Sequence, residues 1–171
     1  MIDLDGVLAD VRHRLHHLQR RPKNWQAFFA AAPQDPPLED GFFVLRELAK
    51  TYEIVYLSGR PESERRATER WLAEHGAPPG RVLLRRHGDR RPARVTKVEA
   101  LRRIADRKPV AVLVDDDPAV CAAVEAAGFT VHRADWGRED PADGGPGDRA
   151  ASGSERDAAT LFDAQEHDGR T

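Results

Sequence analysis

Two aspartates one residue apart, Asp3 and Asp5, lie in the opening run MIDLDGVLAD. Two carboxylates at this spacing, placed at the end of a strand, can share one phosphoryl centre. One attacks phosphorus as a nucleophile, and the other protonates the leaving oxygen and then deprotonates the hydrolytic water. Gly6 lets the backbone turn away from the strand, so that both side chains can face one small pocket. The spacing therefore predicts phosphoryl transfer.

The Asp-x-Asp-Gly pattern also occurs in calcium-binding loops. In those loops acidic residues alternate and a bidentate glutamate closes the loop. Here Val7 and Leu8 follow the glycine and no glutamate closes the loop. The calcium interpretation is therefore disfavoured.

Length and composition indicate one ordinary domain that is not embedded in a membrane. The chain has 171 residues, of which 40% are hydrophobic, which is enough for a full core. No apolar run approaches the roughly 20 residues that span a bilayer, and the pattern of a signal peptide is missing from residues 1–30. We therefore expect a cytoplasmic location. Cys121 lies in an Ala/Val-rich stretch, so we expect a buried thiol and no disulfide.

Charge is distributed unevenly along the chain. Residues 137–171 carry 4 of the 27 basic and 9 of the 29 acidic side chains, which leaves residues 1–136 with a net charge of +3. The acidic segment is rich in glycine and poor in apolar residues, so it is predicted to be a disordered tail without chemistry. The predicted folded domain is residues 1–136.

Short apolar runs alternate with amphipathic stretches in this domain, which is typical of a parallel sheet covered by helices. The pattern predicts strands at Ile54–Leu57, Val82–Leu84, Val110–Val114 and Phe129–Val131, and helices at Phe42–Lys50, Glu62–His75, Val95–Arg107 and Pro118–Ala127.

Polar residues follow the ends of these strands. Asp3 and Asp5 follow the first strand, Ser58-Gly59-Arg60 follows the second and Asp115-Asp116-Asp117 follows the fourth run, while Lys97 begins the helix before that run. Ligands of such folds bind beyond the carboxyl ends of the strands. Four polar groups from distant segments are therefore expected to meet at one edge of the sheet.

Taken together, these groups resemble the haloacid dehalogenase (HAD) superfamily of Mg²⁺-dependent phosphohydrolases. That superfamily has Asp-x-Asp, then Ser/Thr, then Lys, then an acidic pair, and all four parts occur here in this order. Receiver domains use similar groups, but their acidic pair precedes the phosphoacceptor. The resemblance implies a three-layer, doubly wound parallel α/β sheet with a small helical cap insert.

The resemblance implies a role for each matching residue. Asp3 would be the nucleophile and Asp5 the general acid and base. Ser58 would hydrogen-bond a transferring phosphoryl oxygen, and Lys97 would neutralise its charge and hold Asp3. Each residue also has a simpler interpretation: Ser58 as part of a turn and Lys97 as a solvated helix residue.

The same resemblance implies a Mg²⁺ site. Asp116, assisted by Asp115, would complete it together with Asp3 and the backbone carbonyl of Asp5. A divalent ion removes the repulsion between a carboxylate and a phosphate. The simpler interpretation of Asp115-Asp116-Asp117 is a helix N-cap before Pro118.

A closer resemblance is to the 3′-phosphatase domain of bacteriophage-type polynucleotide kinase. It is carried by Ser58-Gly59-Arg60 and by Gly88-Asp89-Arg90-Arg91, whose glycine lies nine residues before Lys97. It implies that Gly59, Arg60 and Arg91 contact the phosphate or the flanking nucleotide. The expected activity is removal of a 3′-phosphate from a polynucleotide end. The alternatives are a 5′-nucleotidase-like phosphatase and a non-catalytic protein that binds phosphate or nucleic acid.

Two neighbouring segments bear on the substrate. Residues 9–41 lie where HAD enzymes insert a cap, and this insert is short, with Trp25, Phe28 and Phe29 as packing anchors. A small cap leaves the cleft open, which suits a nucleic-acid end. The histidines of the insert lack metal-ligand spacing and are expected at the surface. An arginine cluster around the third strand can hold nucleic-acid phosphates, although arginine is frequent throughout the chain: Arg81, Arg85, Arg86, Arg90, Arg91 and Arg94.

The first strand departs from the family pattern, because only Met1 and Ile2 precede Asp3. A central strand of two residues is expected to leave ladder hydrogen bonds unmade. On this basis we expect either a start farther upstream or a fragment of a longer protein.

Overall fold

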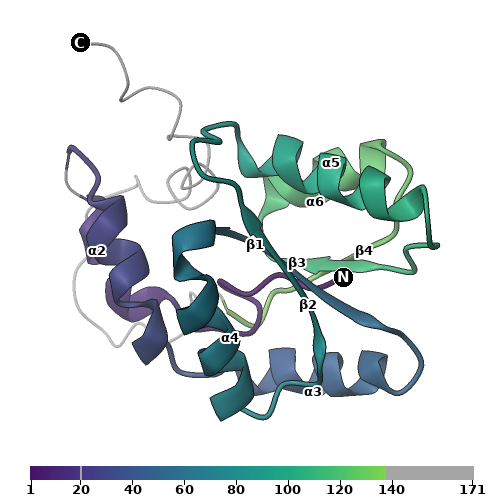
Figure 1. The fold of residues 1–171 in the computed structure, drawn as a ribbon, viewed down its shortest axis with the longest axis horizontal. Helices are drawn as coiled ribbons and strands as arrows, with labels where there is room; N and C mark the ends of the chain where they lie inside the picture. Colours follow the sequence, from purple (N-terminus) through teal and green to yellow (C-terminus); the bar gives the residue numbers. More distant parts are fainter. Residues whose placement is uncertain (20, 138–171) are drawn as a thin grey trace, which may run out of the picture.

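The computed structural model describes residues 1–19 and 21–137 (Figure 1). The predicted acidic tail from residue 138 onward lies outside the described residues. The strands are β1 (Ile54–Pro61), β2 (Gly80–Arg85), β3 (Leu113–Asp115) and β4 (Val131–Arg133). The α-helices are α1 (His16–Gln19), α2 (Trp25–Ala30), α3 (Glu39–Ala49), α4 (Arg65–Glu74), α5 (Ala93–Ala105) and α6 (Pro118–Ala126), and short 3₁₀ helices occupy Arg12–Arg14, Ala32–Gln34 and Glu62–Glu64.

The strands are parallel, and Ile2 joins their two pairs. β1 pairs with β2 and β3 pairs with β4, while Ile2 forms parallel bridges to Tyr56 of β1 and Val114 of β3. The order across the sheet is therefore β2, β1, the segment around Ile2, β3 and β4. The expectation of an α/β fold with parallel strands is confirmed.

The short first strand makes its ladder on both sides, contrary to our expectation. The Ile2 amide donates to the carbonyl of Val55 at 2.9 Å, and the Ile2 carbonyl accepts from the Leu57 amide at 2.9 Å. On the other side, the Asp3 amide donates to Val114 at 2.9 Å. Because residues 1–3 alternate their hydrogen bonds between the two neighbours, even this short segment fixes Asp3 at the centre of the sheet.

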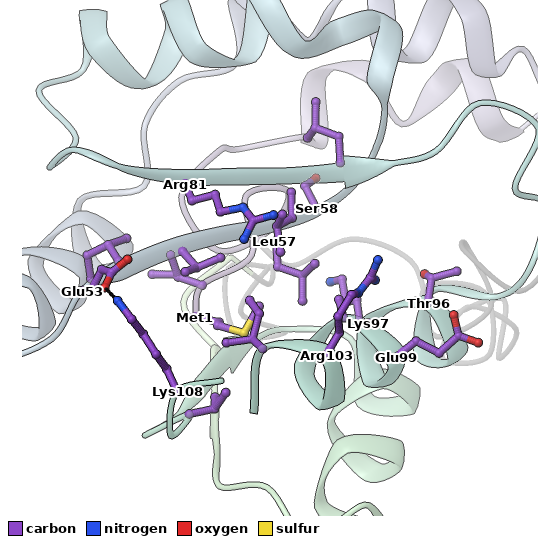
Figure 2. Close-up of a pocket in the computed structure, with 18 of the residues that line it drawn as sticks. Met1, Glu53, Leu57, Ser58, Arg81, Thr96, Lys97, Glu99, Arg103 and Lys108 are labelled. Atoms are coloured by element: carbon purple, nitrogen blue, oxygen red, sulfur yellow. Dashed lines mark hydrogen bonds and ion pairs between the residues drawn. The ribbon is translucent and has the colours of Figure 1, made fainter. Parts of the chain in front are cut away.

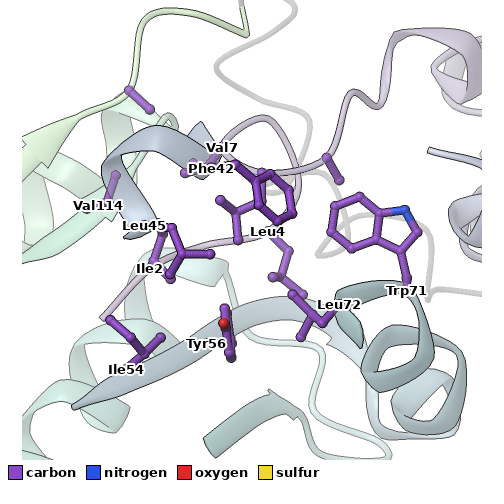
Figure 3. Packing of buried hydrophobic residues seen from close by; sticks show 13 residues of the cluster. Ile2, Leu4, Val7, Phe42, Leu45, Ile54, Tyr56, Trp71, Leu72 and Val114 are labelled. Carbon is purple, nitrogen blue, oxygen red and sulfur yellow. The ribbon is translucent and has the colours of Figure 1, made fainter. Parts of the chain in front are cut away.

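Helices pack on both sides of the strands. In Figure 1, α5 and α6 lie above the strands and α3 and α4 lie below them. The core beside α3 and α4 contains Ile2, Phe42, Leu45, Tyr56 and Trp71 (Figure 3). The core on the other side is formed by Leu57, Ala93, Ala100, Leu101, Leu113, Val120 and Val124.

Some strand bounds differ from the predicted ones. β1 continues through Pro61, so Ser58-Gly59-Arg60 lies within the strand rather than after it. In this part of the strand, between Leu57 and Pro61, the pairing with β2 shifts register. β3 begins at Leu113 rather than Val110. Backbone pairing decides these ends, and it cannot be read from hydrophobicity alone.

Two smaller expectations are confirmed. The side chain of Asp117 accepts hydrogen bonds from the amides of Ala119 at 2.8 Å and Val120 at 3.4 Å, so it caps α6. Cys121 is buried, and its thiol donates to the carbonyl of Asp115. Among the described residues, no helix is long and apolar enough to cross a membrane.

Candidate active site

Three carboxylates meet where the central strands end. Oxygen atoms of Asp3, Asp115 and Asp116 all lie within 4.8 Å of one another. Asp3 Oδ1 is buried and has no hydrogen-bond partner among the described residues. Carboxylate oxygens are the ligands that Mg²⁺ prefers. The cluster therefore has the donors of a divalent-cation site and one oxygen that no group in the described part of the chain satisfies.

Gly6 is required for this close approach. Its φ is +80°, and a Cβ at this position would lie 2.3 Å from Asp116 Oδ2. Any other residue would therefore combine a left-handed backbone with a clash against the acidic cluster. This requirement is tighter than the turn predicted from the sequence.

Burial and like charges shift the pKa values of the cluster. Burial, opposed by Lys97 and reinforced by Asp115, raises the pKa of Asp3. Burial, reinforced by Asp115, raises the pKa of Asp116 to about 7. A bound cation would oppose both effects, because a further positive charge favours the ionised form of these carboxylates.

Lys97 forms ion pairs with two carboxylates of the acidic cluster, Asp3 and Asp115. Its ammonium is 2.8 Å from Asp3 Oδ2 and 2.7 Å from Asp115 Oδ2, and the residue is only 4% exposed. Burial lowers its pKa, but the two carboxylates outweigh burial and raise it overall, so the group stays charged. The structure thus excludes the simpler interpretation of Lys97 as a solvated helix residue.

Asp5 faces two arginines rather than the acidic cluster. Its Oδ1 accepts from Arg14 Nη2 at 2.8 Å and from Arg60 Nε and Nη2 at 2.9 and 2.6 Å. Its Oδ2 is buried and has no partner among the described residues. Burial raises the pKa of Asp5, but Arg60 and Arg14 outweigh it and lower the pKa to about 2.

A fourth charged group, Asp35, holds both arginines in place. It accepts from Arg14 Nε at 2.7 Å, from Arg14 Nη2 at 2.6 Å and from Arg60 Nη2 at 2.9 Å. Its backbone carbonyl accepts from the indole of Trp71 at 2.8 Å. The guanidinium of Arg14 lies over the Phe28 ring, 4.1 Å from the centroid. Asp5, Arg14, Asp35 and Arg60, all at most 5% exposed, form a buried network that we call the arginine clamp.

The sequence reasoning missed Arg14 and Asp35. Both lie within residues 9–41, Arg14 in the 3₁₀ helix Arg12–Arg14 and Asp35 just after the 3₁₀ helix Ala32–Gln34. Their 21-residue separation matches no regular period. His13, predicted at the surface, is exposed, although its Nε2 lies 2.8 Å from Asp35 Oδ1.

The three other predicted site residues, Ser58, Gly59 and Arg91, differ in their exposure to solvent. Ser58 is buried, and its Oγ accepts from the amide of Arg60 at 3.2 Å. The carbonyl of Gly59 accepts from Arg85 Nε at 3.3 Å. Arg91 is exposed and pairs with Asp89 and Glu99 at 2.8 and 2.6 Å. Within the described part of the chain, Arg91 makes no contact with the acidic cluster or the arginine clamp.

Comparisons with known proteins identify similar structures. A solved structure of a Pnkp1/Rnl/Hen1 complex is 27% identical, with a TM-score of 0.64, and the match covers 78% of this chain and 43% of that chain. A second, a Pnkp1/Rnl/Hen1 RNA repair complex, is 27% identical with the same TM-score, over 77% of this chain and 40% of that one. This chain thus spans less than half the length of either matched chain. No curated protein sequence gives a significant match.

A family model supplies the assignment. It describes the phosphatase domain of the polynucleotide kinase PNKP and matches residues 1–138. That range contains the acidic cluster, Lys97 and the arginine clamp. This chain belongs to the family of polynucleotide kinase PNKP phosphatase domains.

Proposed function

We propose that this protein is a Mg²⁺-dependent phosphomonoesterase that removes a 3′-phosphate from a polynucleotide end through an aspartyl-phosphate at Asp3. The observation that carries the proposal is a pair of buried oxygens, Asp3 Oδ1 and Asp5 Oδ2, that have no hydrogen-bond partner among the described residues. The second oxygen of each carboxylate is held, Asp3 Oδ2 by Lys97 and Asp5 Oδ1 by Arg14 and Arg60. Family membership supports phosphatase activity. The three-layer, doubly wound form of the HAD fold and a cytoplasmic location belong to the same proposal.

In the first step Asp3 Oδ1 attacks phosphorus. A bond forms between this oxygen and phosphorus, the bond from phosphorus to the ester oxygen breaks, and that oxygen takes a proton from Asp5 Oδ2. Lys97 fixes the other oxygen of Asp3 and offsets charge on the phosphoryl group. Ser58 contributes a hydroxyl donor to a phosphoryl oxygen.

Asp5 must gain a proton before it can donate one. A pKa near 2 leaves it ionised in the free protein. A phosphoryl group brings negative charge next to Asp5 and attracts Arg14 and Arg60 to itself, and both effects raise the pKa of Asp5. In the second step the ionised Asp5 takes a proton from water, which attacks phosphorus and releases phosphate and free Asp3.

The cation-binding residues fit Mg²⁺. Asp3, Asp115, Asp116 and the backbone carbonyl of Asp5 would hold the ion, and the crowding of three carboxylates supports this set. Bound there, the ion would neutralise the repulsion between the carboxylates and the substrate phosphate.

The nature of the substrate is supported by the cap and by the relatives. The cap insert is small, with Trp25 stacked on Phe29 at 5.8 Å and Phe28 packed on both, so these rings serve as packing anchors. One structurally similar chain belongs to an RNA repair complex. A small cap insert in a family named for polynucleotide kinase favours a nucleic-acid end over a free nucleotide.

Phosphate release tests the proposed substrate. With Mg²⁺ we expect faster release from an oligonucleotide with a 3′-phosphate than from its 5′-phosphorylated isomer or from mononucleotides. Faster release from mononucleotides would contradict the proposed substrate and favour the 5′-nucleotidase alternative. No release from any of them would favour a binding role.

Thermal unfolding tests the cation site. At ten times its dissociation constant, Mg²⁺ is expected to raise the melting temperature by about 5 °C at pH 8. The folded-state pKa of Asp116 is about 7, above its usual 3.8, so the folded protein holds this proton more tightly and loses that stabilisation as pH rises from about 4 to 7. The gain from Mg²⁺ should therefore be smaller at pH 6, where protons compete.

The Asp116→Asn variant is the matched test. It removes one of three crowded charges, so we expect a higher melting temperature without metal at pH 8 and little further gain from Mg²⁺. The control Asp106→Asn, at an exposed position after α5, should behave like the wild type. Equal stabilisation of Asp116→Asn and wild type by Mg²⁺ would contradict the assigned ligand.

A further inference from the structure

A cavity of about 860 Å³ lies between the β1–β2 half of the sheet and α5 (Figure 2). Its floor is apolar and includes Leu57 and Leu83. Ser58 and Lys97 of the candidate active site line it, and so does Tyr52, just before β1. This volume is in the range of ligand-binding sites. We call this cavity the basic groove, and its wall is shared with the phosphatase centre.

The basic groove carries positive charge that the carboxylates of residues 1–19 and 21–137 do not neutralise. Most of its other charged side chains are ion-paired, as Lys108 is with Glu53 and Arg91 is with Asp89 and Glu99. The buried Arg85 donates to backbone carbonyls. Four exposed arginines that line it have no carboxylate partner within the described residues: Arg81, Arg86, Arg103 and Arg107. Arg81 comes from β2 and Arg103 from α5, and Figure 2 shows both side chains extending into the space between these elements.

The groove also offers an exposed aromatic ring. Tyr52 is 49% exposed, although it is a large hydrophobic residue. Sites for single-stranded nucleic acid combine a positively charged groove that follows the backbone with aromatic rings on which bases stack. Guanidinium groups are planar forks suited to phosphate oxygens. Unpaired arginines on two walls, an exposed tyrosine and a wall shared with Ser58 and Lys97 together favour a nucleic-acid strand over a protein partner.

We propose that the basic groove binds the single-stranded nucleic acid that carries the terminal phosphate. Backbone phosphates contact Arg81 and Arg103, and a base stacks on Tyr52. The identity of this strand as the substrate rests on the proposed function, but strand binding itself requires no turnover. The two ideas can therefore fail separately.

Equilibrium binding tests the proposal. The probe is a fluorescein-labelled 20-nucleotide oligothymidylate with a 3′-phosphate, titrated with the full chain at several salt concentrations without divalent ions. The double variant Arg81→Gln, Arg103→Gln is expected to bind about tenfold more weakly, and the slope of log affinity against log salt should fall by about 1.4, since each phosphate contact with a single strand contributes about 0.7. Tyr52→Ala is expected to lose about fivefold in affinity with an unchanged salt slope.

The control is the double variant Arg66→Gln, Arg70→Gln. These arginines are exposed on α4, which packs on the opposite side of the sheet, and the charge change is the same. It should retain the affinity of the wild type. Equal losses in both double variants, or no loss in the groove variant, would overturn the proposal. So would a dimer in sedimentation that the groove variant disrupts while its oligonucleotide affinity is unchanged, because the groove would then be a protein interface.

Activity separates the two failures. If the wild type binds the oligonucleotide through Arg81 and Arg103 but releases no phosphate, the proposed function is wrong and the groove proposal stands. The opposite result is that the wild type hydrolyses both p-nitrophenyl phosphate and the oligonucleotide, while the double variant Arg81→Gln, Arg103→Gln keeps both activities and the same strand affinity. In that case the groove proposal is wrong and the proposed function stands.

Discussion

The Asp3→Asn variant is expected to lose phosphatase activity by a factor of at least about 10⁴ while remaining folded. Removing a covalent nucleophile abolishes the step that forms the intermediate, and losses of this size are typical of such changes. Asn has nearly the same shape, and the change removes one of three like charges in a buried cluster. The measurement is the initial rate of phosphate release with Mg²⁺, together with the melting temperature.

The matched control is again Asp106→Asn, which should keep full activity because this side chain is exposed and remote from the acidic cluster. If Asp3→Asn retained a tenth of the wild-type rate with an unchanged melting temperature, Asp3 would not be the nucleophile. A folded but inactive variant is the result that the site geometry predicts.

Asp35→Ala is expected to give the largest loss of stability, about 3–5 kcal/mol in the free energy of unfolding. It leaves the guanidinium groups of Arg14 and Arg60 buried with only Asp5 to balance them, and breaking a buried charged network by removing one partner costs about this much. Urea denaturation measures the change. The activity of the folded fraction should also fall, because both arginines lose the group that orients them against Asp5.

An exposed ion pair provides the comparison for Asp35. Glu47→Ala removes the partner of Lys50 on the surface of α3, where solvent already screens both charges, so we expect little change in stability. If Asp35→Ala were as mild as Glu47→Ala, the arginine clamp would not be held together in solution as it is in the structure.

The acidic cluster could be predicted from the sequence because topology decides it. Asp3 and Asp115 lie at the carboxyl ends of neighbouring parallel strands, so any arrangement that pairs these strands brings the two carboxylates together. Lys97 follows from the same logic, since α5 crosses to the strand that carries Asp115. The order of these residues along the chain and the rule that ligands bind at the carboxyl ends of parallel strands were sufficient to predict this cluster.

The arginine clamp could not be predicted in the same way. Arg14 and Asp35 belong to an irregular insert whose path is set by packing, and their pairing with Asp5 and Arg60 depends on tertiary contacts that no local period encodes. Arg14 also lies in a segment rich in basic residues, where a buried arginine has the same local signature as an exposed one. The signal that could have identified them is the need of a buried Arg60 for more than one carboxylate.

The extent of the first strand was misjudged for a related reason. Counting the apolar residues before Asp3 predicted unmade ladder hydrogen bonds, but the neighbouring segments on both sides bond to residues 1–3. Arg91 is a different case. It lies at the surface beside the basic groove and pairs with Asp89 and Glu99, so its contact with substrate stays a prediction.

An aspartyl-phosphate at Asp3 can be tested directly by detecting phosphate bound to the protein. An oligonucleotide with a ³²P-labelled 3′-phosphate is mixed with the protein and Mg²⁺, the reaction is quenched in acid within one turnover, and the labelled peptide is mapped. We expect acid-precipitable label that hydroxylamine releases, that maps to the peptide containing Asp3 and that is missing from Asp3→Asn. Phosphate release in a single turnover without any labelled protein, or label that persists in Asp3→Asn, would contradict it.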